Sequence, residues 1–359
     1  MPLSGSPETP FPRMLSLTVT NACNLRCRMC GQWSGEGYAR NDRGEQARTV
    51  PRTMTLDDWK RVVDEAAAAG LESVLIRGGE PFLMPGLTDL LDHIRGKGLF
   101  TSIDTNGTRL ADFAADLVRL GRIHVTISVD GPPDVHEAVR GVPGCFSRIE
   151  EGLRRLSELE EKAGVRISRS ICFTVSPWSV AGLGSMPDTA RRLGIGTLVM
   201  VPYYYVPSAV GAGYEKQMAE KLGVTAFSWR GFRHETSGVD FDVFLEQLRM
   251  YRKGLRGIRN YPYLPLSEDQ YRVWFSDAVT PVGPPDCANS ERLLDIQPGG
   301  EANFCVDFPD YEIGNVLDST LGDLWNGERA ARFRAVRREA PFAVCHRCGA
   351  RHMSETRED

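Results

Sequence analysis

The sequence predicts an α/β fold: a partial (β/α)6 TIM-like barrel followed by a small C-terminal α+β domain. Strand-like and helix-like segments alternate over the first two hundred residues, and such a series forms a parallel sheet with helices outside. Six units rather than eight indicate an open, partial barrel. The predicted strands are 15–20, 73–77, 100–104, 124–129, 166–175 and 197–201.

Helical patterns separate these strands. Thr55 is a good N-cap for a first helix that begins at Leu56, and Gly70 is expected to end it. The other predicted helices are 87–94, 111–120, 146–162 and 187–193, and an amphipathic helix is expected over 241–255.

Three of the predicted strands, 15–20, 124–129 and 166–175, alternate polar with largely apolar residues. Successive side chains of a strand point to opposite faces, so the apolar set packs on the helices and the polar set faces the barrel interior. A closed TIM barrel fills its interior with bulky aliphatic side chains. A polar interior therefore indicates a cavity that holds a polar ligand.

Composition and charge exclude several classes of protein. The chain has 359 residues, 42% of them hydrophobic, and a net charge of −4, which gives no reason to expect a nucleic-acid partner. No apolar run reaches the ~18 residues of a membrane span. The first residues lack a secretory signal, so we expect a cytoplasmic protein. Nine cysteines in a reducing compartment indicate metal ligation rather than disulfides.

Three of these cysteines, Cys23, Cys27 and Cys30, follow the first predicted strand with the spacing C-x3-C-x2-C. Three thiolates can hold three irons of a cubane [4Fe–4S] cluster, and the missing fourth ligand leaves one iron open for chemistry. The alternatives are a zinc knuckle or three unrelated buried cysteines. Zinc prefers four closed ligands, and no histidine or fourth cysteine lies nearby in the sequence.

This spacing and its setting resemble the radical S-adenosylmethionine (radical SAM) superfamily. The resemblance implies that the amino and carboxyl groups of SAM bind the open iron. It also implies that the cluster donates one electron and breaks SAM into methionine and a 5′-deoxyadenosyl radical.

The same resemblance implies SAM-binding residues at the strand ends. The segment 78–80 follows the second predicted strand and resembles the family's GGE segment, which pairs with the amino group of SAM. Residues at the ends of the third and fourth strands touch the ribose or the carboxylate of SAM in relatives, although turn formation explains their glycine neighbours equally well. Met29 occupies a usually aromatic position along the adenine. The implied SAM-binding residues are Met29, Gly78, Gly79, Glu80, Asp104, Asn106, Ser128 and Asp130.

A second cysteine group lies near the C-terminus: Cys287-x12-Gly300-x4-Cys305, then Cys345-x2-Cys348. The first spacing resembles the SPASM/twitch extensions of some radical SAM enzymes. Four cysteines rather than seven imply the shorter, twitch-type version with one auxiliary [4Fe–4S] cluster. The alternative is a zinc ribbon, because four thiolates including a C-x2-C pair suit zinc. We accordingly expect a barrel over 1–205, a bridging segment that closes it over 206–286, and a cluster domain over 287–359.

The two remaining cysteines are our candidate catalytic residues. Cys145 lies on the loop after the fourth predicted strand, and Cys172 belongs to the polar set of the fifth. Free cysteine is usually a small buried hydrophobe. A thiol inside the cavity can instead give a hydrogen atom to a substrate radical, which inverts a stereocentre.

These observations predict a radical SAM oxidoreductase or epimerase that dehydrogenates or epimerises a polar small molecule, such as a sugar, nucleoside or aminocyclitol. Only about a dozen residues precede the first strand, too few for a leader-binding domain, and the auxiliary spacing resembles the dehydrogenase of aminocyclitol antibiotic biosynthesis. One alternative is modification of a ribosomally made peptide. Another is a non-catalytic zinc or iron–sulfur protein. Flavodoxin or ferredoxin is the expected electron donor, and no membrane partner is expected.

Overall fold

The computed structural model describes residues 10–34, 37, 53–283, 287 and 289–349. The N-terminal residues that we expect to lack a signal, and residues 350–359 of the expected cluster domain, lie outside the described residues.

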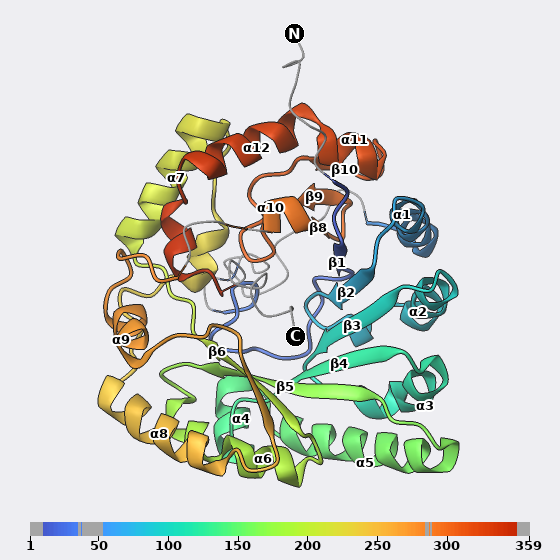
Figure 1. Cartoon of the computed structure of the whole chain (residues 1–359), viewed down its shortest axis with the longest axis vertical. Helices are drawn as coiled ribbons and strands as arrows, with labels where there is room; N and C mark the ends of the chain where they lie inside the picture. Colours follow the sequence, from blue (N-terminus) through green and yellow to red (C-terminus); the bar gives the residue numbers. More distant parts are fainter. Residues whose placement is uncertain (1–9, 35–36, 38–52, 284–286, 288, 350–359) are drawn as a thin grey trace.

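The fold is one ten-stranded sheet in the order β10-β9-β8-β1-β2-β3-β4-β5-β6-β7, shown in Figure 1. The first six strands run parallel in sequence order, which confirms the predicted series of βα units. Their bounds are β1 Met14–Thr18, β2 Ser73–Arg77, β3 Phe100–Thr105, β4 Ile123–Ser128, β5 Ser168–Val175 and β6 Thr197–Pro202.

Two further parallel strands extend this sheet, one at each end. β7 (Arg259–Pro262) pairs with β6, and β8 (Leu293–Ile296) pairs with β1. The hairpin of β8 and β9 (Glu301–Asn303) was expected as part of a separate C-terminal domain, but it joins the barrel sheet, and β10 (Gly314–Asn315) follows it. Among the described residues β7 and β8 do not pair, so the barrel stays open between them.

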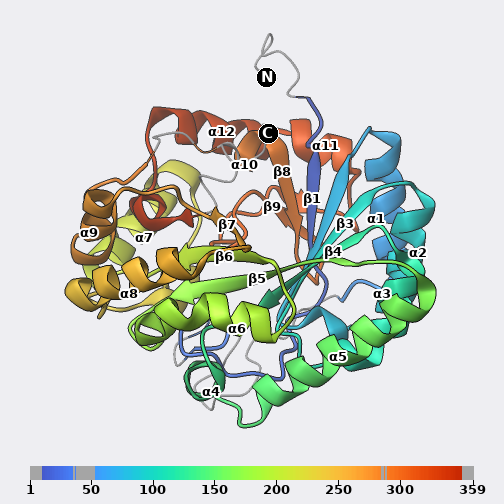
Figure 2. The same ribbon diagram turned by 60° about the horizontal axis from the view of Figure 1, so that its bottom comes forward.

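The helices α1, α2, α3 and α5 lie outside the curved sheet, and α6 and α8 cover its β5–β6 side (Figure 2). Thr55 caps α1 in a capping box with Asp58, as its position predicted. The helices expected from the sequence are α1 Leu56–Ala68, α2 Leu87–Gly96, α3 Leu110–Leu120, α5 Cys145–Ala163, α6 Met186–Arg192 and α8 Phe241–Gly254. Those not expected are α4 Pro133–Arg140, α7 Ser208–Leu222, α9 Glu268–Ser276, α10 Asn289–Arg292, α11 Leu321–Asn326 and α12 Glu328–Glu339.

The two faces of the strands differ as the alternation predicted. Leu15 and Leu17 of β1 pack without exposure in the core between sheet and helices. Ser16, between them, faces inward and donates a 2.6 Å hydrogen bond to Asp295 of β8. Asp295 also accepts from Gln297 and Asn303, so a buried polar network ties β1 to the C-terminal hairpin.

In the part of the chain that the structure describes, no helix is both long and apolar enough to cross a membrane.

The Ser16 bond gives a test of the junction between the first strand and the C-terminal hairpin. Ser16→Ala removes the donor and leaves a buried carboxylate oxygen short of a partner, so the free energy of unfolding should fall by ~1–3 kcal/mol. Urea denaturation of the anaerobically purified chain measures this. Thr53→Ala, at an exposed position, is the control and should change it by less than ~0.5 kcal/mol. Equal effects of the two variants would contradict the junction.

Candidate functional site

A cavity of about 390 Å³ opens at the carboxyl ends of the barrel strands. Its wall combines the loop after β1 with the ends of β2 to β6 and with segments that follow them. Its lining includes Cys23, Cys27, Met29, Cys30, Arg77, Gly78, Gly79, Asp104, Asn106, Ser128, Arg140, Cys172, Tyr204 and Asp307.

The three thiols of the C-x3-C-x2-C motif all face this cavity. Burial raises the pKa of Cys23 to about 12 and that of Cys30 to about 11, and the neighbouring thiols add to both increases. Three thiolates gathered there therefore need positive charge to compensate them. Iron supplies that charge in a cubane cluster, so the chemistry of this donor set fits the expected group.

The loop that carries these thiols is held by backbone contacts on two sides. The backbone N–H groups of Arg26 and Arg28 donate hydrogen bonds to the backbone carbonyls of Arg140 and Val139 in α4. On the other side, a Cβ at Gly79 would lie 2.3 Å from the carbonyl oxygen of Ala22, so only glycine allows this approach. The Gly78-Gly79 pair thus seats the loop and also lines the cavity.

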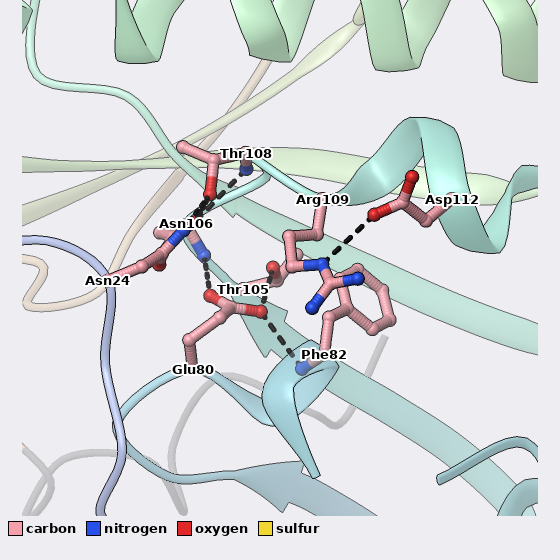
Figure 3. A network of polar contacts seen from close by, with 8 residues as sticks. All are labelled: Asn24, Glu80, Phe82, Thr105, Asn106, Thr108, Arg109 and Asp112. Atoms are coloured by element: carbon pink, nitrogen blue, oxygen red, sulfur yellow. Dashed lines mark hydrogen bonds and ion pairs between the residues drawn. The ribbon is translucent and has the colours of Figure 1, made fainter. Parts of the chain in front are cut away.

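The Glu80 carboxylate is absent from the cavity wall and is directed to protein groups (Figure 3), so a contact of the segment 78–80 with SAM stays a prediction that would not use this carboxylate. It has no exposure and accepts from the Thr105 hydroxyl and from the amides of Asn106 and Phe82, at 2.7–3.1 Å. Glu80 caps the turn Pro81–Leu83 and joins the ends of β2 and β3.

Asn106 lines the cavity, but its side chain forms hydrogen bonds with other residues of the protein (Figure 3). Its amide nitrogen donates to Asn24, and its amide oxygen accepts from Thr108. Asn24 lies next to Cys23, so Asn106 holds the thiol-bearing loop.

Asp130 is also absent from the cavity wall, contrary to expectation. It is completely buried, accepts from the Thr174 amide, and pairs at 2.6 Å with Nε of Arg140. Arg140 in turn directs Nη1 to the sulfur of Cys27 at 3.7 Å. Asp130 therefore acts on the thiol-bearing loop through Arg140, a residue that sequence reasoning missed because it lies on an unexpected helix.

The other expected residues do lie on the cavity wall: Met29, Gly78, Gly79, Asp104, Ser128 and Cys172. Burial raises the pKa of Asp104, and the positive charge of Arg77 partly offsets this increase. Burial also raises the pKa of Cys172 to about 12, and the negative charge of Asp104 makes the next largest contribution to that increase. Cys172 therefore carries its proton at neutral pH.

Cys145 is not on the cavity wall, so the expectation that it faces a substrate is wrong. It is fully buried at the start of α5, where it packs against Leu25 and Cys27 behind the thiol-bearing loop. It behaves as the small buried hydrophobe that free cysteine usually is.

Sequence reasoning also missed Arg77 and Asp307. Arg77 is the last residue of β2, directly before Gly78. The burial of side chains alternates along β2, and Arg77 belongs to the inward-facing set, so this alternation could have predicted that Arg77 faces the cavity. Asp307 lies two residues after Cys305, and no motif or periodicity in the sequence around it predicted that it would face the cavity.

A second, smaller cavity is lined by all four C-terminal cysteines: Cys287, Cys305, Cys345 and Cys348. Burial raises the pKa of Cys305, and the other three thiols add to that effect, so these four also form one donor set.

Two residues separate the cavities. Asp307 lines both of them. Tyr204, on the wall of the larger cavity, directs its hydroxyl to Asp307 and to the sulfur of Cys348 at 3.9 Å. The C-terminal cysteines therefore lie one residue layer away from the larger cavity.

Iron content tests both donor sets. Anaerobic reconstitution should give about eight irons per chain without zinc, and about four in the Cys23/Cys27/Cys30→Ala variant, because each cubane holds four irons. Iron, sulfide and zinc analysis measures this. About four irons falling to none, with one zinc retained, would instead make the C-terminal cysteines a zinc site.

Family models match the two parts of the chain that carry these cysteines. Residues 17–167 match the radical SAM superfamily, and residues 287–349 match SPASM, an iron–sulfur cluster-binding domain.

Three individual relatives each share less than a third of their aligned residues with this chain. The sporulation killing factor maturation protein SkfB of Bacillus subtilis is 31% identical over 159 residues, which cover 44% of this chain and 35% of SkfB. The Fe-coproporphyrin III synthase of Methanosarcina barkeri is 24% identical over 91% of this chain and 77% of its own length. The crystal structure of Streptococcus suis SuiB with S-adenosylmethionine aligns over 91% of this chain and 68% of SuiB, at 16% identity and a TM-score of 0.62, which shows the shared fold.

Both cysteine groups, their cavities and the two matches lead to one assignment. The chain belongs to the radical SAM superfamily, with a C-terminal SPASM domain, and its cofactors are SAM and two [4Fe–4S] clusters.

Proposed function

We propose that the chain modifies a ribosomally made peptide by abstracting a hydrogen atom from a C–H bond of one residue. The observation that carries this proposal is a cavity of about 390 Å³ that is lined by Cys23, Cys27 and Cys30 and shares Asp307 with the cavity of the four C-terminal cysteines. SkfB, at 31% identity, is named for maturation of a killing factor, and this supports a peptide more than a sugar, nucleoside or aminocyclitol.

The size of the cavity limits what can enter it. Pockets for one drug-sized ligand range over about 300–1,000 Å³, so SAM and its cluster would occupy most of the space available here. A peptide can insert one side chain or one Cα and keep the rest of its length outside. The substrate therefore reacts through one small inserted group.

A tetrapyrrole is the competing substrate, because the Fe-coproporphyrin III synthase matches most of this chain. One feature of the cavity counts against it: a macrocycle beside SAM would need more of the space than one inserted side chain does, in a cavity of about 390 Å³.

The cavity wall supports two outcomes for the substrate radical. Bound SAM and its cluster supply the 5′-deoxyadenosyl radical that removes the first hydrogen. Cys172, with its proton retained, can return a hydrogen atom from its own side of the cavity, which gives epimerisation. This leaves a thiyl radical on Cys172, which one electron from the external donor and one proton reduce back to the thiol. Asp307 and Tyr204, beside Cys348, can instead take up the proton that accompanies oxidation. Flavodoxin or ferredoxin remains our proposed electron donor, and the cytoplasm our proposed location.

The substrate class is tested with precursor peptides encoded beside the gene. The reconstituted enzyme, SAM and dithionite should release 5′-deoxyadenosine faster when the correct peptide is present, and mass spectrometry should find that peptide changed. The Cys23/Cys27/Cys30→Ala variant is the control and should release none. Stimulation by coproporphyrin, or by an aminocyclitol, with every peptide inert would overturn the proposal.

Cys172 decides between the two outcomes. If the reaction is epimerisation, Cys172→Ala should lose deuterium transfer from solvent at the product stereocentre while 5′-deoxyadenosine still forms. Cys145→Ala, which alters a thiol away from the cavity, should keep that transfer. Because the pKa of Cys172 is raised to about 12, transfer in the wild type should be unchanged between pH 7 and 9. A product two hydrogens lighter, with Cys172 dispensable, would indicate dehydrogenation.

A further inference from the structure

One arginine lies beside the thiols of each cysteine group, and the two arginines differ in their partners. Arg337 of α12 lines the cavity of the four C-terminal cysteines and is only 8% exposed. Its guanidinium hydrogen-bonds to Cys287, and Nη1 donates to the backbone carbonyl of Ala340 at 3.1 Å. The positive charge of Arg337 is thus directed at the auxiliary donor set.

The surroundings of Arg337 leave its charge uncompensated by carboxylates. Burial alone would lower the pKa of Arg337, but the thiolates of Cys345, Cys287 and Cys305 reverse this effect and raise it. Among the described residues, no ion pair joins Arg337 to a carboxylate, whereas its neighbour Arg338 pairs with Glu291. The thiolates are therefore the negative groups that Arg337 faces.

The arginine of the other group is arranged differently. Arg140 reaches Cys27 with Nη1, but its Nε pairs at 2.6 Å with the fully buried carboxylate of Asp130. That carboxylate offsets part of the field that Arg140 would exert on the SAM-binding cluster. Among the described residues, the arginine that contacts Cys27 is thus paired with a carboxylate, and the arginine that contacts Cys287 is not.

Charge and hydrogen bonds to the sulfurs set the reduction potential of an iron–sulfur cluster. One added electron makes a cluster more negative, and a buried cation stabilises that form more than the oxidised form. The effect is large where water is excluded, because the effective dielectric constant is low.

We propose that Arg337 raises the reduction potential of the auxiliary cluster above that of the SAM-binding cluster. The Asp130–Arg140 pair leaves the SAM-binding cluster without a matching increase. Arg337 is a positioning residue in this proposal, since it acts through the thiolates and touches no substrate. The proposal depends on the two clusters and is independent of which substrate the enzyme modifies.

Redox titration followed by EPR tests this in the full chain, with Cys23/Cys27/Cys30→Ala as the background so that only the auxiliary cluster contributes. Arg337→Gln should lower the reduced-to-oxidised ratio at a fixed potential at least tenfold, a shift of about 59 mV for a one-electron couple. Arg337→Lys keeps the charge and should stay close to the parent potential. Arg338→Gln removes an exposed charge one residue further along α12 and should leave the potential unchanged.

A second variant tests the charge without altering the cavity wall. Ala340→Glu, at an exposed position whose backbone carbonyl accepts from Arg337, adds a carboxylate near Arg337 and should lower the potential by less than Arg337→Gln does. If Arg337→Gln fails to hold four irons, Ala340→Glu tests the effect of Arg337 on the reduction potential instead. An unchanged potential in Ala340→Glu and in every loaded Arg337→Gln sample, or an equal shift in Arg338→Gln, would overturn the proposal.

Discussion

The contact between the thiol-bearing loop and the ends of β2 and α4 is the constraint on which the site depends. A Cβ at Gly79 would collide with the carbonyl oxygen of Ala22, and the loop amides of Arg26 and Arg28 bind the last carbonyls of α4. These are backbone contacts, so they fix the path of the loop whatever its side chains do. This path places the three thiols on the cavity wall.

Side chains that resemble cofactor ligands in the sequence serve this loop instead. Glu80 joins β2 to β3, Asn106 holds Asn24 beside Cys23, and Asp130 aligns Arg140 toward Cys27. Burying a carboxylate is costly unless it is paired or hydrogen-bonded, and both Glu80 and Asp130 meet that condition within the protein. These contacts hold the loop that carries the three thiols, which is the usual role of such supporting shells.

The segments that carry the two cysteine groups adjoin one sheet. β8 pairs with β1, so the segment that begins at Cys287 folds directly against the strand that leads to Cys23. Tyr204 and Asp307 then fill the narrow space between the cavities. This closeness lets one enzyme combine hydrogen abstraction with a nearby redox centre. The buried arginines give these two centres different electrostatic surroundings.

The sequence by itself determined the six parallel strands, their polar inner face and both cysteine groups, because alternation and short spacings are local properties of the chain. It also placed Ser128 and Cys172 on the cavity side through their phase in the strands, and Asp104 through its place at the end of a strand. Only the tertiary structure decided which polar side chains face the cavity beyond the strand ends, where no periodicity fixes direction. It moved Glu80, Asp130 and Cys145 off the wall and brought Arg140 and Asp307 onto it, because those positions depend on packing between segments far apart in the chain.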